Sequence, residues 1–216
     1  MASQGSGARV KGRNFERKTA KGLSEWWGFR FNSSPASGAL HWSGDNNVAG
    51  DLVVPPSAGF PFVIECKKHE EWTIENLFLN NKDVKNWWAQ VVSDALEVGK
   101  TPMLVYTRNR AKTFVTMAYN ESLVKEIEER KFPCMVSNVE FKDEFDETHC
   151  YKTFTTLIEA ITSFIPVSDK NKDCFKYHFK NYNWRDQLVR ETHKIEDAQQ
   201  VEVMDSIDQM MKGIDK

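Results

Sequence analysis

The sequence has no long apolar run. A helix that crosses a membrane needs roughly 18 or more consecutive, mostly apolar residues, and no stretch of this chain approaches that length. The first residues, MASQGSGARVKGR, also lack the apolar centre of a secretory signal peptide. We therefore expect a soluble protein of the cytoplasm, which would be the host cytoplasm if the protein is viral.

Paired cysteines are missing as well. The chain has four cysteines and no Cys-x-x-Cys pair, which argues against a disulfide framework and against a ribbon-type zinc site. The remaining zinc hypothesis joins His149, Cys150, Cys174 and His178, but the spacing is imperfect for zinc ligands. We favour buried, reduced thiols and surface histidines.

The chain has no overall excess of positive charge, because 29 Lys and Arg stand against 31 Asp and Glu, a net charge of -2. Attraction of a polyanion depends on local patches rather than on totals, however. Acidic residues collect in the tail from about residue 196. Basic residues outnumber Glu16 and Glu25 in the first part of the chain, where they are Arg9, Lys11, Arg13, Arg17, Lys18, Lys21 and Arg30.

The length and composition allow one sizeable core, since 40% of the 216 residues are hydrophobic. We predict three parts. Residues 1–10 form a flexible N-terminal arm, residues 11–118 a core domain, and residues 119–216 a C-terminal extension that is mixed and then mainly helical.

Hydrophobic periodicity predicts an α/β fold, with a mixed sheet flanked by helices. A long polar loop, residues 32–50, separates the first helix from the central strands, and the acidic stretch 140–147 is expected to be a surface loop. Strands 50–54 and 62–67 most simply pair as an antiparallel hairpin. Helices are expected at 11–27, 83–98, 154–164 and 201–214, and strands at 29–31, 50–54, 62–67, 103–106 and 113–118.

Three charged side chains on the central strands predict a metal site. Glu65 and Lys67 are two residues apart, so both point to the same face of their strand. Asp51 begins the neighbouring strand and is expected to lie beside Glu65. Mg²⁺ prefers oxygen ligands and is held through one or two carboxylates, with the carbonyl of Cys66 as a further ligand. Glu16, on the first helix, is a candidate for a second metal or its water.

Such a site is suited to phosphodiester hydrolysis. The metal ion polarises a phosphoryl oxygen and acidifies water, while Lys67 orients the nucleophile and offsets negative charge. A Glu-x-Lys pair alone is common on half-exposed strands, where it is simply solvated. The pair gains weight here from its order in the chain after Glu16 and Asp51.

The motifs Gly50-Asp51 and Glu65-Cys66-Lys67 resemble those of the PD-(D/E)xK nuclease superfamily, which has a restriction-endonuclease-like core. The run GRNFERK, containing Glu16, and the run SPASG at 34–38 are more narrowly similar to archaeal-type and phage Holliday junction resolvases. The resemblance implies a homodimer that uses Mg²⁺ or Mn²⁺ to nick four-way DNA junctions. It covers about residues 11–118.

The same resemblance implies roles for individual residues. It makes Glu16, Asp51, Glu65 and Lys67 catalytic, places a hydroxyl of the loop with Ser34 and Ser37 near the scissile phosphate, and adds Gln90 from the second helix. Expected metal ligands are Asp51, Glu65, Cys66 and Glu16. Expected DNA contacts are Arg9, Lys11, Arg13, Arg17, Ser34, Ser37, Lys68, Arg108 and Arg110.

Two alternatives remain at this point. The loop between Gly38 and Gly50 is longer than in a minimal resolvase, and about a hundred C-terminal residues are extra. Both leave open a restriction-like or DNA-repair, end-processing nuclease that acts on other DNA structures. A DNA-binding module without catalysis is the second alternative, and the complete set of acidic residues and lysine argues against it.

Overall fold

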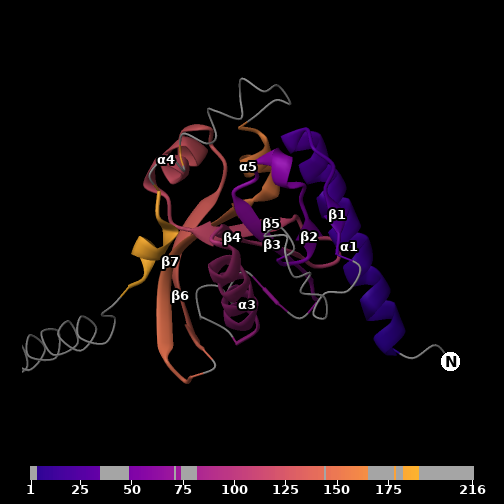
Figure 1. The fold of residues 1–216 in the computed structure, drawn as a ribbon, viewed down its shortest axis with the longest axis horizontal. Helices are drawn as coiled ribbons and strands as arrows, with labels where there is room; N and C mark the ends of the chain where they lie inside the picture. Colours follow the sequence, from indigo (N-terminus) through magenta and orange to yellow (C-terminus); the bar gives the residue numbers. More distant parts are fainter. Residues whose placement is uncertain are drawn as a thin grey trace, which may run out of the picture.

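A computed structural model describes residues 4–34, 49–70, 72–73, 82–143, 145–164, 178 and 182–189 (Figure 1). Ser37, most of the polar loop, Cys174 and the acidic tail lie outside these residues. In chain order the elements are α1 (Gln4–Trp27), β1 (Asn32–Ser33), β2 (Leu52–Val53), the 3₁₀ turn η1 (Pro56–Ala58), β3 (Phe62–Lys68), α3 (Lys82–Val98), β4 (Thr101–Thr107), β5 (Phe114–Ala118), α4 (Glu121–Glu129), β6 (Cys134–Lys142), β7 (Thr148–Leu157), α5 (Ile158–Thr162) and η2 (Trp184–Gln187).

Five strands form one mixed sheet in the order β3-β4-β5-β7-β6. β3 is parallel to β4, and α3 connects the two strands, as parallel pairing requires a crossover. The other neighbours pair antiparallel. Helices flank this sheet (Figure 1), so the predicted α/β class is confirmed. β3 is one edge strand of the sheet, and the short β1–β2 pair lies beyond it.

The first hydrophobic core lies between the sheet and α1, α4 and α5. α1 contributes Phe15, Ala20, Leu23, Trp26 and Trp27, all buried, which confirms the predicted apolar stripe. From β3, alternate residues enter this core because successive side chains of a strand point to opposite faces. They are Phe62, Ile64 and Cys66.

The second core lies between the other face of the sheet and α3. Trp88 and Val91 of α3 are fully buried there, as the predicted stripe of this helix requires. Trp72 and Trp184 close the same core from the connecting segments, and the indole of Trp184 donates to the carbonyl of Lys100 at 2.9 Å. The intervening side chains of β3, Glu65 and Lys67 among them, lie on this side.

Three predicted details near the N-terminus are wrong. α1 begins at Gln4 rather than Lys11, because a helix already nucleated by downstream residues extends through weak helix formers at modest cost. The first strand is Asn32–Ser33 rather than 29–31. Segment 50–54 does not form an antiparallel hairpin with β3: β2 pairs with β1, and the bridge between Gly50 and Ile64 is parallel.

The second half of the chain contains more β-strand than predicted. β6 and β7 form a long hairpin, and β7 also pairs with β5, so the sheet continues past Ala118, the expected end of the core. The stripe predicted as a helix at 154–164 divides between β7 and α5. The predicted helix at 201–214 lies outside the described residues. Within the described part, no helix combines the length and apolarity needed to cross a membrane.

Candidate functional site

The predicted acidic residues meet at the edge of the sheet formed by β3. Asp51 and Glu65 are 4% and 2% exposed, respectively. Burial of two carboxylates beside each other is unfavourable in an ordinary core, because charged groups lose their hydration there. The pair lies at a sheet edge between α1 and α3, where side chains of both helices can reach it.

The backbone holds Asp51 against β3. Its N–H donates to the carbonyl of Ile64, and its carboxylate oxygen Oδ2 accepts from the N–H of Cys66, both at 2.8 Å. Gly50 makes this approach possible. Its φ is +75°, and a Cβ there would collide with the Ile64 carbonyl oxygen, so only glycine suits the position.

Lys67 links β3 to α3. Its Nζ lies 2.5 Å from Glu65 Oε1 and donates to Gln90 Oε1 at 2.9 Å. The Lys67 side chain is 25% exposed, so the ammonium faces the solvent while its two acceptors fix its direction. The predicted proximity of Glu65, Lys67 and Gln90 is therefore present in the fold.

Burial raises the pKa of Glu65 to about 7, with the neighbouring charge of Asp51 adding to the effect and Lys67 opposing it. Burial also raises the pKa of Asp51, against the hydrogen bond from Cys66. Glu65 Oε2 is buried and accepts no hydrogen bond from an N–H or hydroxyl group of the described residues, and the Glu65 carboxyl lies against that of Asp51. Such an oxygen costs free energy unless a donor or a cation reaches it.

α1 brings a third carboxylate to this edge. Glu16 is half-buried, and its pKa is raised by burial and by the charge of Asp51. One helical turn later, Thr19 is 5% exposed and hydrogen-bonds the Cys66 thiol. The sequence analysis did not single out Thr19, although its spacing of three residues from Glu16 places both on one helix face.

The expected DNA contacts are distributed unevenly around the site. The N–H of Ser34 donates to the carbonyl of Asp51 at 2.8 Å, so this residue is adjacent to the acidic group. Lys68 pairs with Thr107 at the ends of β3 and β4. Arg108 and Arg110 are exposed in the turn that follows β4, at this same end of the strands.

The charged residues of α1 extend the site on its other side. The charges of Arg13 and Arg17 act on Glu16. Arg9 and Lys11 are exposed, nearer the helix N-terminus, and nothing in the described structure brings them into contact with the carboxylates.

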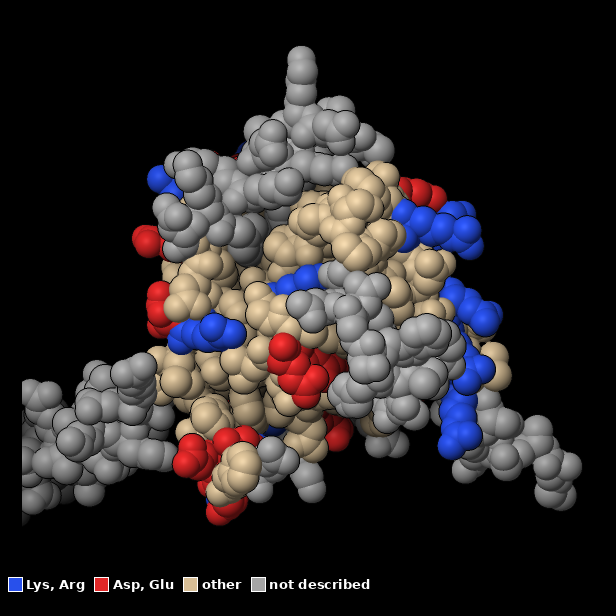
Figure 2. Space-filling model, viewed as in Figure 1, with Lys and Arg blue, Asp and Glu red and all other residues tan. Residues whose placement is uncertain are grey.

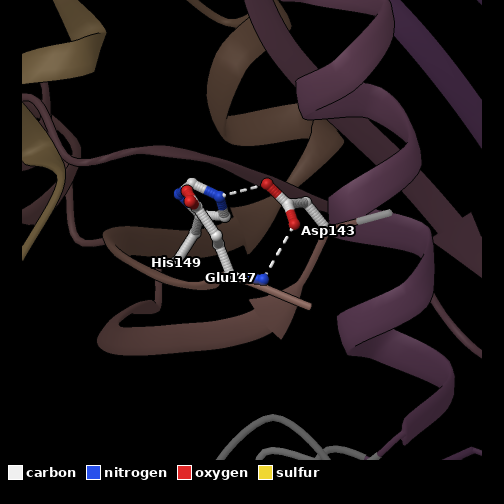
Figure 3. Close-up of side chains that lie close together, drawn as sticks. All are labelled: Asp143, Glu147 and His149. Atoms are coloured by element: carbon white, nitrogen blue, oxygen red, sulfur yellow. Dashed lines mark hydrogen bonds and ion pairs between the residues drawn. The ribbon is translucent and has the colours of Figure 1, made fainter. Parts of the chain in front are cut away.

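A second group of ligand-type side chains lies at the opposite edge of the sheet. Asp143, Glu147 and His149, which we name the turn cluster, offer atoms within 4.8 Å of one another in the β6–β7 turn (Figure 3). Asp143 Oδ1 accepts from the N–H groups of Phe145 and Glu147, and Oδ2 lies 2.8 Å from His149 Nε2. These bonds close the hairpin and account for the arrangement.

The described histidines do not support a zinc site with the cysteines. His149 pairs with Asp143, while His178 lies 2.8 Å from Glu126 and 3.0 Å from Ser122 on α4. Cys150 is buried on β7, and its register partner is Glu140. Cys66 and Cys150 are buried as expected, whereas Cys134 is half-buried. The expectation of a surface histidine is wrong for His178, whose side chain is 8% exposed.

Comparison with known proteins identifies the family. No curated protein and no solved structure matches the chain. The profile of the family described as "Phage putative PDDEXK endonuclease" matches residues 7–171. This range includes α1 except its first three residues, the whole five-stranded sheet and the buried carboxylates at its β3 edge. The chain belongs to this phage endonuclease family, within the PD-(D/E)xK nuclease superfamily.

Proposed function

We propose that the protein is a metal-dependent, structure-selective DNA endonuclease that hydrolyses phosphodiester bonds. The observation that carries the proposal is the buried pair Asp51 and Glu65, with one carboxylate oxygen that accepts no hydrogen bond from an N–H or hydroxyl group of the described residues, beside the Lys67 ammonium. A pair that is costly to bury is retained where it binds a ligand or performs chemistry.

The donor set suits Mg²⁺, with Mn²⁺ as a substitute. Asp51 and Glu65 form a buried pair of carboxylates beside the ammonium of Lys67, and a divalent cation would offset their charge. Glu16 is a third carboxylate, on which Arg13 and Arg17 also act. Asp51, Glu65 and the Cys66 carbonyl are the proposed ligands, and Glu16 holds a second ion or its water. Glu65 Oε2 is the atom that most needs such a cation.

A bound Mg²⁺ supplies positive charge that polarises a phosphoryl oxygen and acidifies water. Lys67 orients the attacking water and stabilises negative charge that develops on the phosphate. Gln90 acts as a positioning residue, because its hydrogen bond to Lys67 Nζ fixes the ammonium. The Ser34 and Ser37 loop supplies a hydroxyl near the scissile phosphate.

The proposed substrate is a four-way DNA junction, cut by a homodimer so that two sites face two strands. The resemblance of the Glu16 and SPASG motifs to junction resolvases supports this substrate. Basic side chains beside the site supply backbone contacts: Arg9, Lys11, Arg13, Arg17, Lys68, Arg108 and Arg110. The proposed location is the cytoplasm of the infected host.

Cleavage of a labelled DNA panel tests the proposal. With Mg²⁺, the protein is expected to cut a four-way junction at opposed strands and to cut a linear duplex far more slowly. Asp51→Asn should abolish cleavage and leave junction binding measurable. Retained cleavage in this variant would refute the assigned site.

The same panel separates the alternatives. Comparable rates on flaps, nicked duplex and linear duplex would favour a restriction-like or end-processing nuclease and exclude a resolvase. Inactivity on every DNA form with both Mg²⁺ and Mn²⁺ would favour a DNA-binding module without catalysis. A monomeric mass on the bound junction would overturn the proposed dimer.

A further inference from the structure

A hollow of about 480 Å³ lies between α1 and β1. Residues of both walls are neighbours of residues in the acidic site. Arg17 of α1 lines it, and the charge of Arg17 also acts on Glu16. Ser33 of β1 lines the other wall, and the next residue, Ser34, donates its N–H to Asp51. The hollow therefore lies next to the acidic site, along α1 and β1.

Three of the nine residues that line the hollow are cationic. Arg17, Lys21 and Arg30 line it, and all three are exposed. Glu25 is the one acidic residue in its lining, 3.9 Å from Lys21 in a well-solvated pair that contributes little. Phe31 also lines it but is 4% exposed, so its ring offers no face for base stacking. The lining is suited to phosphates rather than to bases.

A row of basic residues on α1 leads into the hollow. Arg9, Arg13, Arg17 and Lys21 follow one another at intervals of four residues, and residues four apart are neighbours on a helix surface. At 1.5 Å per residue, the row spans about 18 Å. One DNA strand carries a phosphate about every 3.4 Å along the helix axis, so the length of the row corresponds to about five phosphates. The row also winds around α1, because a step of four residues exceeds one turn of 3.6. Figure 2 shows blue side chains along α1 on this face.

We infer that the hollow between α1 and β1 binds the phosphodiester backbone of the DNA strand that flanks the cleavage site. Lys21 and Arg30 are its anchoring residues, and neither belongs to the contacts proposed above. Backbone contacts fix the position of a strand without reading its sequence, so the hollow sets where the strand crosses the acidic site. The inference rests on the proposed function, because it takes DNA as the ligand.

Salt-dependent binding tests the inference. The full chain with Asp51→Asn binds a fluorescently labelled four-way junction without cutting it, and its dissociation constant is measured by anisotropy across a salt series. Lys21→Gln and Arg30→Gln, each added to this background, should weaken binding several-fold. Each should lower the slope of log affinity against log salt by about 0.9, the value for one lost phosphate contact on a duplex.

Two further variants provide matched controls. Lys125→Gln removes one positive charge from an exposed position of α4 and should leave the slope unchanged. Glu25→Gln should tighten binding, because it removes the one acidic residue from the lining. An equal loss with Lys125→Gln would indicate a general charge effect and overturn the inference, as would unchanged slopes for Lys21→Gln and Arg30→Gln.

The experiment also separates this inference from the proposed function. If the protein cuts junctions with Mg²⁺ but Lys21→Gln and Arg30→Gln leave the salt dependence of binding unchanged, only the inference about the hollow is refuted. Reduced slopes in a protein that cuts no DNA refute the nuclease function and leave the hollow as a backbone-binding site. Cleavage positions add a third readout. Arg30→Gln should spread the cut over neighbouring phosphates, whereas Lys125→Gln should leave it in place.

Discussion

Two groups of carboxylates lie at opposite edges of one sheet and are held in opposite ways. At the β3 edge, Glu65 keeps a buried oxygen that accepts no hydrogen bond from an N–H or hydroxyl group of the described residues, and its pKa is raised by burial. In the turn cluster, both oxygens of Asp143 are paired, and its hydrogen bond to His149 lowers its pKa. The hydrogen bonds of the turn cluster close a hairpin, whereas burial at the β3 edge disfavours the charged form of both carboxylates.

The largest expected effect concerns cleavage. Glu65→Gln should lower kcat for DNA cleavage by at least about a thousandfold, because it removes a proposed metal ligand and the partner of Lys67. Asp143→Asn should leave kcat within about twofold. Single-turnover cleavage of the preferred DNA measures both. A large loss with Asp143→Asn would mean that the turn cluster, and not the β3 edge, carries the chemistry.

The second effect concerns the stability of the metal-free protein. The pKa of Glu65 is about 7 in the fold against an ordinary value of 4.5. The folded protein therefore favours the protonated Glu65 carboxyl. The stability that this form contributes is fully present below pH 4.5 and is lost as the pH rises through 7. By pH 8 the burial of the charged carboxylate costs on the order of a few kcal/mol, since each pKa unit corresponds to about 1.4 kcal/mol.

Urea unfolding in EDTA measures this cost. Glu65→Gln should be more stable than the natural protein at pH 8, and the difference should disappear toward pH 5. Comparing the two proteins at each pH cancels the titration of their shared groups. A natural protein that stays the more stable of the two at pH 8 would contradict the raised pKa.

The third effect concerns metal binding. Mg²⁺ at 100 times its Kd should stabilise the fold by about 2.7 kcal/mol, as mass action requires for a ligand that binds only the folded state. Thermal unfolding with and without Mg²⁺ measures the change in Tm. Asp51→Asn should lose the shift and Asp143→Asn should keep it. The reverse pattern would move the metal to the turn cluster.

The smallest effect is on the turn cluster itself. Asn at position 143 still accepts the two backbone N–H groups but loses the charge beside His149, so Asp143→Asn should lower Tm only slightly at pH 7. The pKa of Asp143 lies below its ordinary value of 3.8. The difference in Tm between the two proteins should therefore disappear once the pH falls below the lowered pKa and Asp143 is protonated. A difference that persists at low pH would show that the charge is not its cause.

The sequence predicts that Glu65 and Lys67 lie together, because local spacing determines it. Alternation along a strand places Glu65 and Lys67 together, and helical spacing places Glu16 near the apolar stripe of α1. The same reasoning predicts α3 and the β4–β5 pair. In each case the decisive contacts lie within one element or between neighbours in the chain.

Nonlocal pairing explains what the sequence does not predict. β7 lies between β5 and β6, and a periodic pattern carries no information on that order. Its buried threonines also look polar, yet their hydroxyls pair across strands, as Thr155 does with Thr116 at 2.7 Å. The parallel bridge at Gly50 depends on the path through residues 54–61, which the hydrophobic pattern does not specify.

Gly50 gives this site an unusual vulnerability. Every proposed ligand and the lysine survive a Gly50→Ala substitution, yet the added methyl meets the Ile64 carbonyl and Val63 Cγ1, the latter at 2.9 Å. Position 51 must then move away from β3. The chain would keep all of its charged groups but lose the positions of these groups relative to one another. The placement of Asp51 beside Glu65 therefore depends on a residue that has no side chain.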